Sequence, residues 1–389
     1  MMEIYYDNSA TTQVCPEAAN AALTAMTKEY GNPSSVHSRG ASAFRCLNEA
    51  RTTIAKAMGV AAEEIYFASC GTEANNTAVF GAVASGGKRA QRLLISAIEH
   101  PSVDQPAKYL MNKGHQLDFV PVNREGIVDV AALRQLLNDE VSLVSIMHVN
   151  NETGSVQPLA EIGAAIRELA PQAVFHVDAV QSFARLSLEL KNWRADACTI
   201  SGHKIHAPKG IAALWIRQGC RIQPLLRGGG QEKGMRSGTE NMPGIMALAA
   251  AAEQATANMA QYREQIAAVR CRLIEGLQAE LSDVIINSPE NGAAHILNLS
   301  FLGTRSEVLL HYLEQKGLYV SAGSACTSKS SKGSHVLEAM NLPPEVVDSA
   351  LRFSFSRFNT LDEAEQAISI IVPSVQEIRM IMGINKKKR

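Results

Sequence analysis

Seven short apolar segments alternate with longer helical patterns between residues 60 and 216, and this alternation limits the fold more than any other feature of the sequence. Buried parallel strands are rich in β-branched and apolar residues, as these segments are. The spacers, such as 101–113 and 158–169, are long enough for crossover helices. The sequence therefore predicts an α/β domain with a mostly parallel, seven-stranded sheet. Its strands are expected at 64–68, 92–96, 117–121, 143–149, 173–178, 197–201 and 211–216.

The remaining residues predict a second, smaller domain. A chain of 389 residues is longer than one compact core usually needs. Residues 240–281 are rich in Ala, Leu, Gln and Glu, which favours long helices that leave the sheet. We expect a large domain at 15–256 and a small α+β domain formed by 1–14 and 257–389. The small domain is expected to contain strands at 296–301, 318–322 and 351–356 and helices at 305–316 and 361–381.

Charge and cysteine content exclude several classes of protein. The net charge is −1 and the basic residues are scattered except at 386–389, so no nucleic-acid-binding face is expected. No apolar run approaches the ~20 residues that span a bilayer, and the N-terminal residues lack the pattern of a signal peptide. The seven cysteines show neither a disulfide framework nor metal-ligand spacing. We therefore expect reduced thiols, no metal site, no membrane contact and a cytoplasmic location.

Polar residues follow several of the predicted strands. Ligands of open parallel sheets bind at the carboxyl ends of the strands, so these residues are candidates for a site. The segment "SCGTEANN" (69–76) predicts a helix start that could hold a phosphate, or only an ordinary N-cap. The other side chains could equally be satisfied polar groups or helix caps. The candidates are Thr72, His100, Asn150, Asn151, Asp178 and Gln181.

Lys204 lies directly after the predicted strand 197–201, in "SGHKIHAPKG" (201–210). A lysine there is either a surface residue or an amine that forms a Schiff base. Considered alone, the surface position is favoured. Together with a phosphate cradle, the ring-sized His100 and the acid Asp178 on the same sheet edge, Lys204 completes the set of groups that hold pyridoxal phosphate.

Nine motifs, in order along the whole chain, resemble the cysteine desulfurase family. The most specific are "SGHK", "RSGT" and "GSAC" in combination. The resemblance implies a fold-type I, pyridoxal-phosphate-dependent transferase of the NifS/IscS-like group with a long cysteine loop. The motifs are "YDNSATT" (6–12), "GNPSS" (31–35), "SCGTEANN", "MHVNNETG" (147–154), "HVDAVQS" (176–182), "SGHKIHAPKG", "GMRSGTEN" (234–241), "SAGSACTS" and "LRFSFSR" (351–357).

The resemblance implies a role for each residue of the cofactor site. Lys204 would bind the cofactor covalently and move protons at the substrate α-carbon. Asp178 would contact the pyridine nitrogen, Gln181 would contact the phenolic oxygen, and His100 would stack on the ring and act as an acid or base. Asn151 would contact both the cofactor and the substrate. The phosphate would be held by Gly71, Thr72, Ser201 and His203.

Three further residues acquire roles only through the resemblance. Thr239 would reach the phosphate of the partner subunit, which implies a homodimer. Arg352 would bind the substrate carboxylate in a bidentate geometry, although a surface ion pair is the alternative. Cys326, in the loop 321–334, would take the sulfur. The small residues around Cys326 predict a loop that can move between the substrate and an acceptor.

The implied reaction converts L-cysteine to L-alanine and leaves sulfur on Cys326 as a persulfide. The acceptor would be an iron–sulfur scaffold or a thiolation protein, and the sequence does not distinguish these. One alternative is an aminotransferase or β-lyase of the same fold, which needs no loop cysteine. Another alternative is a protein that delivers sulfur or acts as a scaffold without catalysis. Such a protein would not need the complete set of catalytic residues that this sequence contains, namely Lys204, Asp178, His100, Cys326 and Arg352.

Overall fold

The computed structural model describes residues 3–86, 91–322 and 333–383. A seven-stranded sheet forms the centre of the larger part, in which only the contacts of β8 are antiparallel. The predicted fold class is confirmed, and every predicted strand of this sheet is present within two residues of its expected bounds. In spatial order the strands are β2 (Ile65–Ala68), β8 (Ala212–Ile216), β7 (Ala197–Ser201), β6 (Val174–Asp178), β5 (Val141–Met147), β3 (Arg92–Ser96) and β4 (Gln116–Val120).

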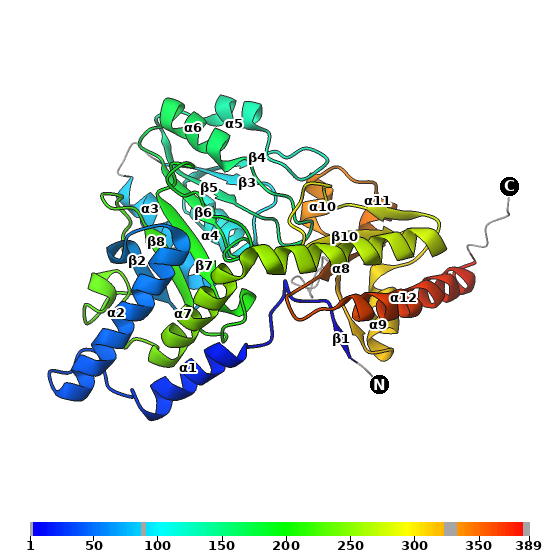
Figure 1. Ribbon diagram of the computed structural model, residues 1–389. Helices are drawn as coiled ribbons and strands as arrows, with labels where there is room; N and C mark the ends of the chain where they lie inside the picture. Colours follow the sequence, from blue (N-terminus) through cyan, green and yellow to red (C-terminus); the bar gives the residue numbers. More distant parts are fainter. Residues whose placement is uncertain (1–2, 87–90, 323–332, 384–389) are drawn as a thin grey trace.

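Helices cover both faces of this sheet because alternate residues of each strand point to opposite sides. In β3, Leu93 and Ile95 pack in one core with Val79 and Val103 of two covering helices, whereas Leu94 belongs to the core on the other face. Figure 1 shows the helices around the sheet. They are α1 (Pro16–Thr27), α2 (Ser38–Met58), α3 (Gly71–Ser85), α4 (Pro101–Asn112), α5 (Val130–Leu136), α6 (Leu159–Leu169) and α7 (Met242–Ala257).

A separate hydrophobic core lies in the C-terminal part of the chain. The helix α8 (Met259–Glu280) leads to it from the sheet, and Figure 1 shows α8 running toward the orange and red elements. Ile4 and Tyr6 pack in this core although they belong to the other end of the chain. The domain boundaries given above remain a prediction. Further helices in this part are α9 (Ser306–Gln315), α10 (His335–Ala339), α11 (Pro344–Asp348) and α12 (Leu361–Ile381).

The strand predicted over 318–322 is wrong in one respect, because the chain there forms two strands in different sheets. Its first part, β11 (Leu318–Tyr319), pairs in parallel with β1 (Ile4–Tyr5). Its second part, β12 (Ser321–Ala322), pairs with a strand of another sheet. The backbone on the two sides of Val320 therefore has different hydrogen-bonding partners. The second sheet has the order β12, β13 (Ala350–Ser354), β10 (Ile296–Phe301) and β9 (Val284–Ile286).

Within the described ranges, no helix has the length and apolar character that crossing a membrane requires.

Candidate active site

A cavity of about 450 Å³ opens at the carboxyl ends of the central strands. Asp178 is the last residue of β6, Ser201 is the last residue of β7, and Gly71 begins the helix that follows β2. Parallel strands bring such residues to one sheet edge. Of the predicted site residues that the structure describes, all except Thr239 line the cavity, namely Gly71, Thr72, His100, Asn151, Asp178, Gln181, Ser201, His203, Lys204 and Arg352.

Lys204 is held at the cavity by the N-terminal segment of the chain. It ends a short 3-10 turn, Gly202–Lys204, directly after β7. Its Nζ donates hydrogen bonds to the carbonyl oxygens of Ser9 and Ala10, at 2.5 Å and 2.8 Å. The amine is therefore fixed by backbone acceptors inside the cavity, and the surface position considered from the sequence does not apply.

Asp178 is 5% exposed and its carboxylate accepts two hydrogen bonds. The side-chain amide of Asn75 donates to Oδ2 at 2.7 Å, and the backbone N–H of Val180 donates to Oδ1 at 2.9 Å. Sequence reasoning did not assign Asn75 a role. The signal was its position one helical turn after Gly71, which places both residues on the same face of α3.

His100 caps α4, and its ring lies between charged neighbours. Nδ1 accepts from the backbone N–H of Ser102 at 3.1 Å and lies 2.8 Å from the hydroxyl of Ser102. Burial lowers the pKa of His100, and this effect exceeds the opposing attraction of Asp178, while Lys204 lowers the pKa further. The ring is therefore neutral near pH 7 and can accept a proton.

Glu99 lies next to His100 and is fully buried behind the cavity. Its Oε1 accepts from the hydroxyl of Ser96 at 2.5 Å and from the backbone N–H of Met147 at 2.8 Å. Burial raises the pKa of Glu99 to about 8 despite these hydrogen bonds. Near pH 7 Glu99 is mostly protonated, so it adds little negative charge beside the site.

Arg352 reaches the cavity from β13 in the C-terminal part of the chain. Its side chain is only 8% exposed, so the surface ion pair considered from the sequence is excluded. Nη2 pairs with Asp7 at 2.8 Å and Nη1 donates to the carbonyl oxygen of Asn151 at 2.9 Å. Asp7 was not assigned a role from the sequence, although it lies in the quoted motif 6–12. The buried Nε has no partner among the described residues.

The residues present fit pyridoxal phosphate. A phosphate can accept hydrogen bonds from the backbone N–H groups in the first turn of α3. Gly71 has no side chain and therefore leaves room for the phosphate to approach these groups. A Cβ at Gly71 would lie 3.3 Å from Val180 and 3.5 Å from Ser201. The hydroxyl of Ser201 and Oε1 of Gln181 are buried without a hydrogen-bond partner among the residues described. Buried polar atoms are normally paired, so these two point to a polar ligand.

Thr239 does not line this cavity, and Cys326 is not among the described residues. Thr239 is exposed and lines a different cavity, together with Ser69 and Arg236. Cys326 and most of the loop 321–334 lie outside the described residues. Ser321, the first residue of β12, lines the active-site cavity, so the described chain reaches this cavity shortly before the loop cysteine.

Comparisons with known proteins agree with this geometry. The sequence profile of the family Aminotransferase class-V matches residues 4–366. The chain is 40% identical to Cysteine desulfurase 2 of Trichormus variabilis over 98% of its own length and 95% of that protein. It is 38% identical to Cysteine desulfurase IscS of Methanosarcina thermophila, over 99% and 95% of the two chains.

A solved structure titled NIFS-LIKE PROTEIN superposes with a TM-score of 0.90 at 33% identity and covers 99% of this chain and 100% of that chain. The shared family and the fit of the cavity identify the cofactor as pyridoxal phosphate. The chain belongs to the class-V aminotransferase family and, within it, to the cysteine desulfurases.

Proposed function

We propose that this protein converts L-cysteine to L-alanine and transfers the sulfur to Cys326. The observation that carries the proposal is one cavity that joins Lys204, Asp178, His100 and Arg352. These groups supply an amine, an acid for a pyridine nitrogen, a neutral imidazole and a carboxylate clamp. The family relationship to cysteine desulfurases supports the same reaction.

Each residue has a distinct task in the proposed reaction. Lys204 binds the cofactor and moves the proton at the substrate α-carbon, because its Nζ lies in the cavity. Pyridoxal phosphate, when bound, accepts the electron pair that the departing α-proton leaves behind. Asp178 holds the pyridine nitrogen protonated, and Asn75 orients its carboxylate through the 2.7 Å hydrogen bond. His100 accepts or returns a proton, since burial keeps it neutral near pH 7.

Cys326 receives the sulfur as a nucleophile. Its thiolate attacks the sulfur of the substrate, a new S–S bond forms, and the Cβ–S bond of the substrate breaks. The three-carbon fragment gains the proton that the Cys326 thiol lost and leaves as L-alanine. Sulfur remains as a persulfide on Cys326, so atoms and electrons balance without an external oxidant.

A single assay tests the reaction. The purified protein with bound pyridoxal phosphate is incubated with L-cysteine, and alanine and protein-bound sulfur are measured together. We expect alanine to form, and mass spectrometry to find one added sulfur atom on Cys326. Sulfide release with pyruvate instead of alanine would indicate a β-lyase, and a protein that binds no pyridoxal phosphate would indicate a non-catalytic scaffold.

Replacing Arg352 with lysine is expected to weaken recognition of cysteine. The variant keeps a positive charge but loses the paired N–H groups, and a hydrogen bond to a charged group contributes about 1.5–3 kcal/mol, or roughly 10- to 100-fold in kcat/KM. KM for cysteine should rise, while the absorption spectrum of the bound cofactor stays the same. Arg217→Lys is the control, because Arg217 is exposed, pairs with Asp196 and lies outside the active-site cavity. An unchanged KM in Arg352→Lys would remove the clamp from the proposal.

We also propose a homodimer in which Thr239 completes the phosphate site of the partner. Two features support this: Thr239 is exposed, and it lies outside the cavity of its own chain. The ion pair of Arg236 with Glu73 ties the segment before Thr239 to the first turn of α3. A solution mass equal to one chain would contradict the dimer.

The sulfur is proposed to pass to a protein acceptor in the cytoplasm, such as an iron–sulfur scaffold or a thiolation protein. The described cysteines are all unpaired, which is typical of a reducing compartment. Incubation of a cell extract with labelled cysteine would identify the acceptor as the protein that takes the label from Cys326. Recovery of the protein outside the cytoplasmic fraction would contradict the location.

A further inference from the structure

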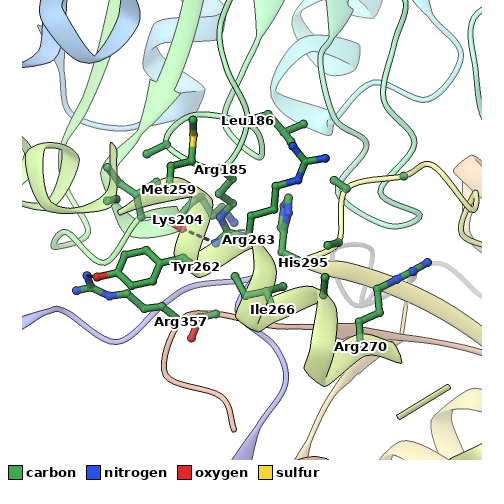
Figure 2. Close-up of a pocket in the computed structure, with 18 of the residues that line it drawn as sticks. Arg185, Leu186, Lys204, Met259, Tyr262, Arg263, Ile266, Arg270, His295 and Arg357 are labelled. Carbon is green, nitrogen blue, oxygen red and sulfur yellow. Dashed lines mark hydrogen bonds between the residues drawn. The ribbon is translucent and has the colours of Figure 1, made fainter. Parts of the chain in front are cut away.

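A second cavity, of about 360 Å³, shares only Lys204 with the active-site cavity. It lies between the large sheet and the helix α8, and Figure 2 shows its lining. The side chain of Lys204 contacts the N-terminal segment, whereas its carbonyl oxygen accepts a hydrogen bond from Arg185, at 2.6 Å. The backbone of Lys204 thus separates the two cavities.

The lining of the second cavity is rich in arginine. The chain as a whole has a net charge of −1, so this concentration of basic groups is local. Among the described residues that line the cavity, Glu290 is the one acid, and it is exposed. Besides Lys204, the arginines of the lining come from the sheet domain, from α8 and from the C-terminal part: Arg185, Arg263, Arg270 and Arg357. Burial lowers the pKa of His206 to about 4 and that of His295 well below its usual value, so these two rings add no charge near pH 7.

One nitrogen of the Arg185 guanidinium has no hydrogen-bond partner among the described residues. Its Nη2 donates to the carbonyl oxygen of Lys204, but its buried Nη1 has no partner in the described part of the chain. Burial without a counter-ion lowers the pKa of the guanidinium to about 10. A buried cation without an anionic partner is costly, so the fold keeps an uncompensated charge here.

Two neighbours of Arg185 also have nitrogen atoms for which the described residues provide no partner. His295 is 3% exposed, and its buried Nε2 has no hydrogen-bond partner among the described residues. Arg263 of α8 is exposed and forms no ion pair with any described carboxylate. Figure 2 shows His295 beside the side chain of Arg263, which extends toward Leu186, and Arg185 next to Lys204. Burial lowers the pKa of His295 well below its usual value, so its ring is neutral, and the donors available to an anionic group are those of Arg185 and Arg263.

The rest of the lining is apolar or aromatic. Met259, Tyr262 and Ile266 occupy positions three and four apart on α8, so one face of the helix lines the cavity. The Tyr262 hydroxyl accepts a hydrogen bond from Arg357 at 3.1 Å, and the guanidinium carbon lies 5.2 Å from the centre of the Tyr262 ring. A ligand of this cavity would therefore contact both charged donors and carbon surface.

We propose that this cavity is a binding site for a small organic anion, with its charged group at Arg185 and Arg263 and its carbon part against α8. The charged group is a carboxylate or a phosphate ester, because both accept hydrogen bonds from guanidinium groups in pairs. An inorganic ion would not use the apolar face of the cavity. The site is independent of the proposed desulfurase reaction.

Isothermal titration calorimetry of the protein with bound pyridoxal phosphate tests the site. Succinate and glycerol phosphate are the two probes, and neutral succinamide is the negative control. Arg263→Ala is the test variant because this side chain is exposed and unpaired, so its loss leaves the fold intact. Arg272→Ala removes the same charge from the same helix at an exposed ion pair with Glu365 and is the matched control.

We expect at least one anionic probe to bind saturably, and Arg263→Ala to weaken it roughly tenfold or more, as loss of one charged hydrogen bond does. Arg272→Ala and Arg352→Lys should leave this binding unchanged, the latter because Arg352 lines the other cavity. The probe that binds more tightly identifies the anionic group. Absence of binding by both probes, equal binding of succinamide, or loss in Arg352→Lys but not in Arg263→Ala would overturn the proposal.

Discussion

Replacing Lys204 with alanine is expected to lower the rate of alanine formation from L-cysteine by at least ~10³-fold, because covalent attachment of the cofactor and proton transfer at the α-carbon are lost together. The amine is held in the cavity by the carbonyl oxygens of Ser9 and Ala10. No other lysine in the described part of the chain lines this cavity and could replace it. The rate is measured with saturating cysteine and pyridoxal phosphate.

A chemical readout separates this role from a structural one. Borohydride reduction should fix the cofactor to Lys204 in the parent protein and to no residue in the variant, as found by mass spectrometry of peptides. Lys209→Ala is the matched control, since Lys209 is exposed and lies in the same segment, 201–210. Cofactor fixed to another lysine, or a parent-like rate in Lys204→Ala, would show that the site is misassigned.

Replacing Cys326 with alanine is expected to abolish persulfide formation while the cofactor spectrum remains. Without the thiolate, cleavage of the Cβ–S bond loses its nucleophile, and the rate should fall by roughly 10²-fold or more. Bound sulfur is measured by mass spectrometry after incubation with cysteine, and alanine is measured in parallel. The same experiment decides between a desulfurase and a β-lyase, because a β-lyase needs no thiol.

Cys70 provides the control for this variant, because it is a cysteine that also lines the cavity. Cys70 caps α3 and its Sγ accepts from the backbone N–H of Glu73 at 3.4 Å, so we expect a structural role. Cys70→Ser keeps a capping atom and should keep the persulfide on Cys326. If sulfur is found on Cys70 and remains in Cys326→Ala, Cys70 is the carrier and the proposal is wrong.

The strands of the large sheet could be predicted because the sequence patterns that indicate them involve only neighbouring residues. Each buried strand is a short apolar run between turn or helix signals, and β3, β7 and β8 begin and end within one residue of the expected bounds. The prediction of a single strand over 318–322 was wrong because a local pattern indicates where a strand lies, but it does not indicate which strand it pairs with. At Val320 the chain leaves β1 and joins β13, and no feature of the five residues encodes that change.

The same distinction applies to the candidate site. Gly71, Asp178 and Lys204 follow strands of one sheet, so their convergence could be inferred from the order of the elements. Asn75 was not assigned a role, because its contact with Asp178 depends on how α3 packs beside β6. Ser102 was not assigned a role either, although its contact with His100 is local to the start of α4. Asn and Ser also occur in helices that take no part in a binding site, so their residue types alone did not mark these two positions.

The sequence by itself determined the α/β class, the positions of the strands and the residues that follow them, because hydrophobic periodicity and strand ends are properties of neighbouring residues. Only the tertiary structure decided that Arg352 pairs with Asp7 beside the active-site cavity. It also decided that Arg185 and Arg263 line the same second cavity. These groups come from distant segments, and their distances are set by the packing of two separate cores. Local patterns carry no information about that packing.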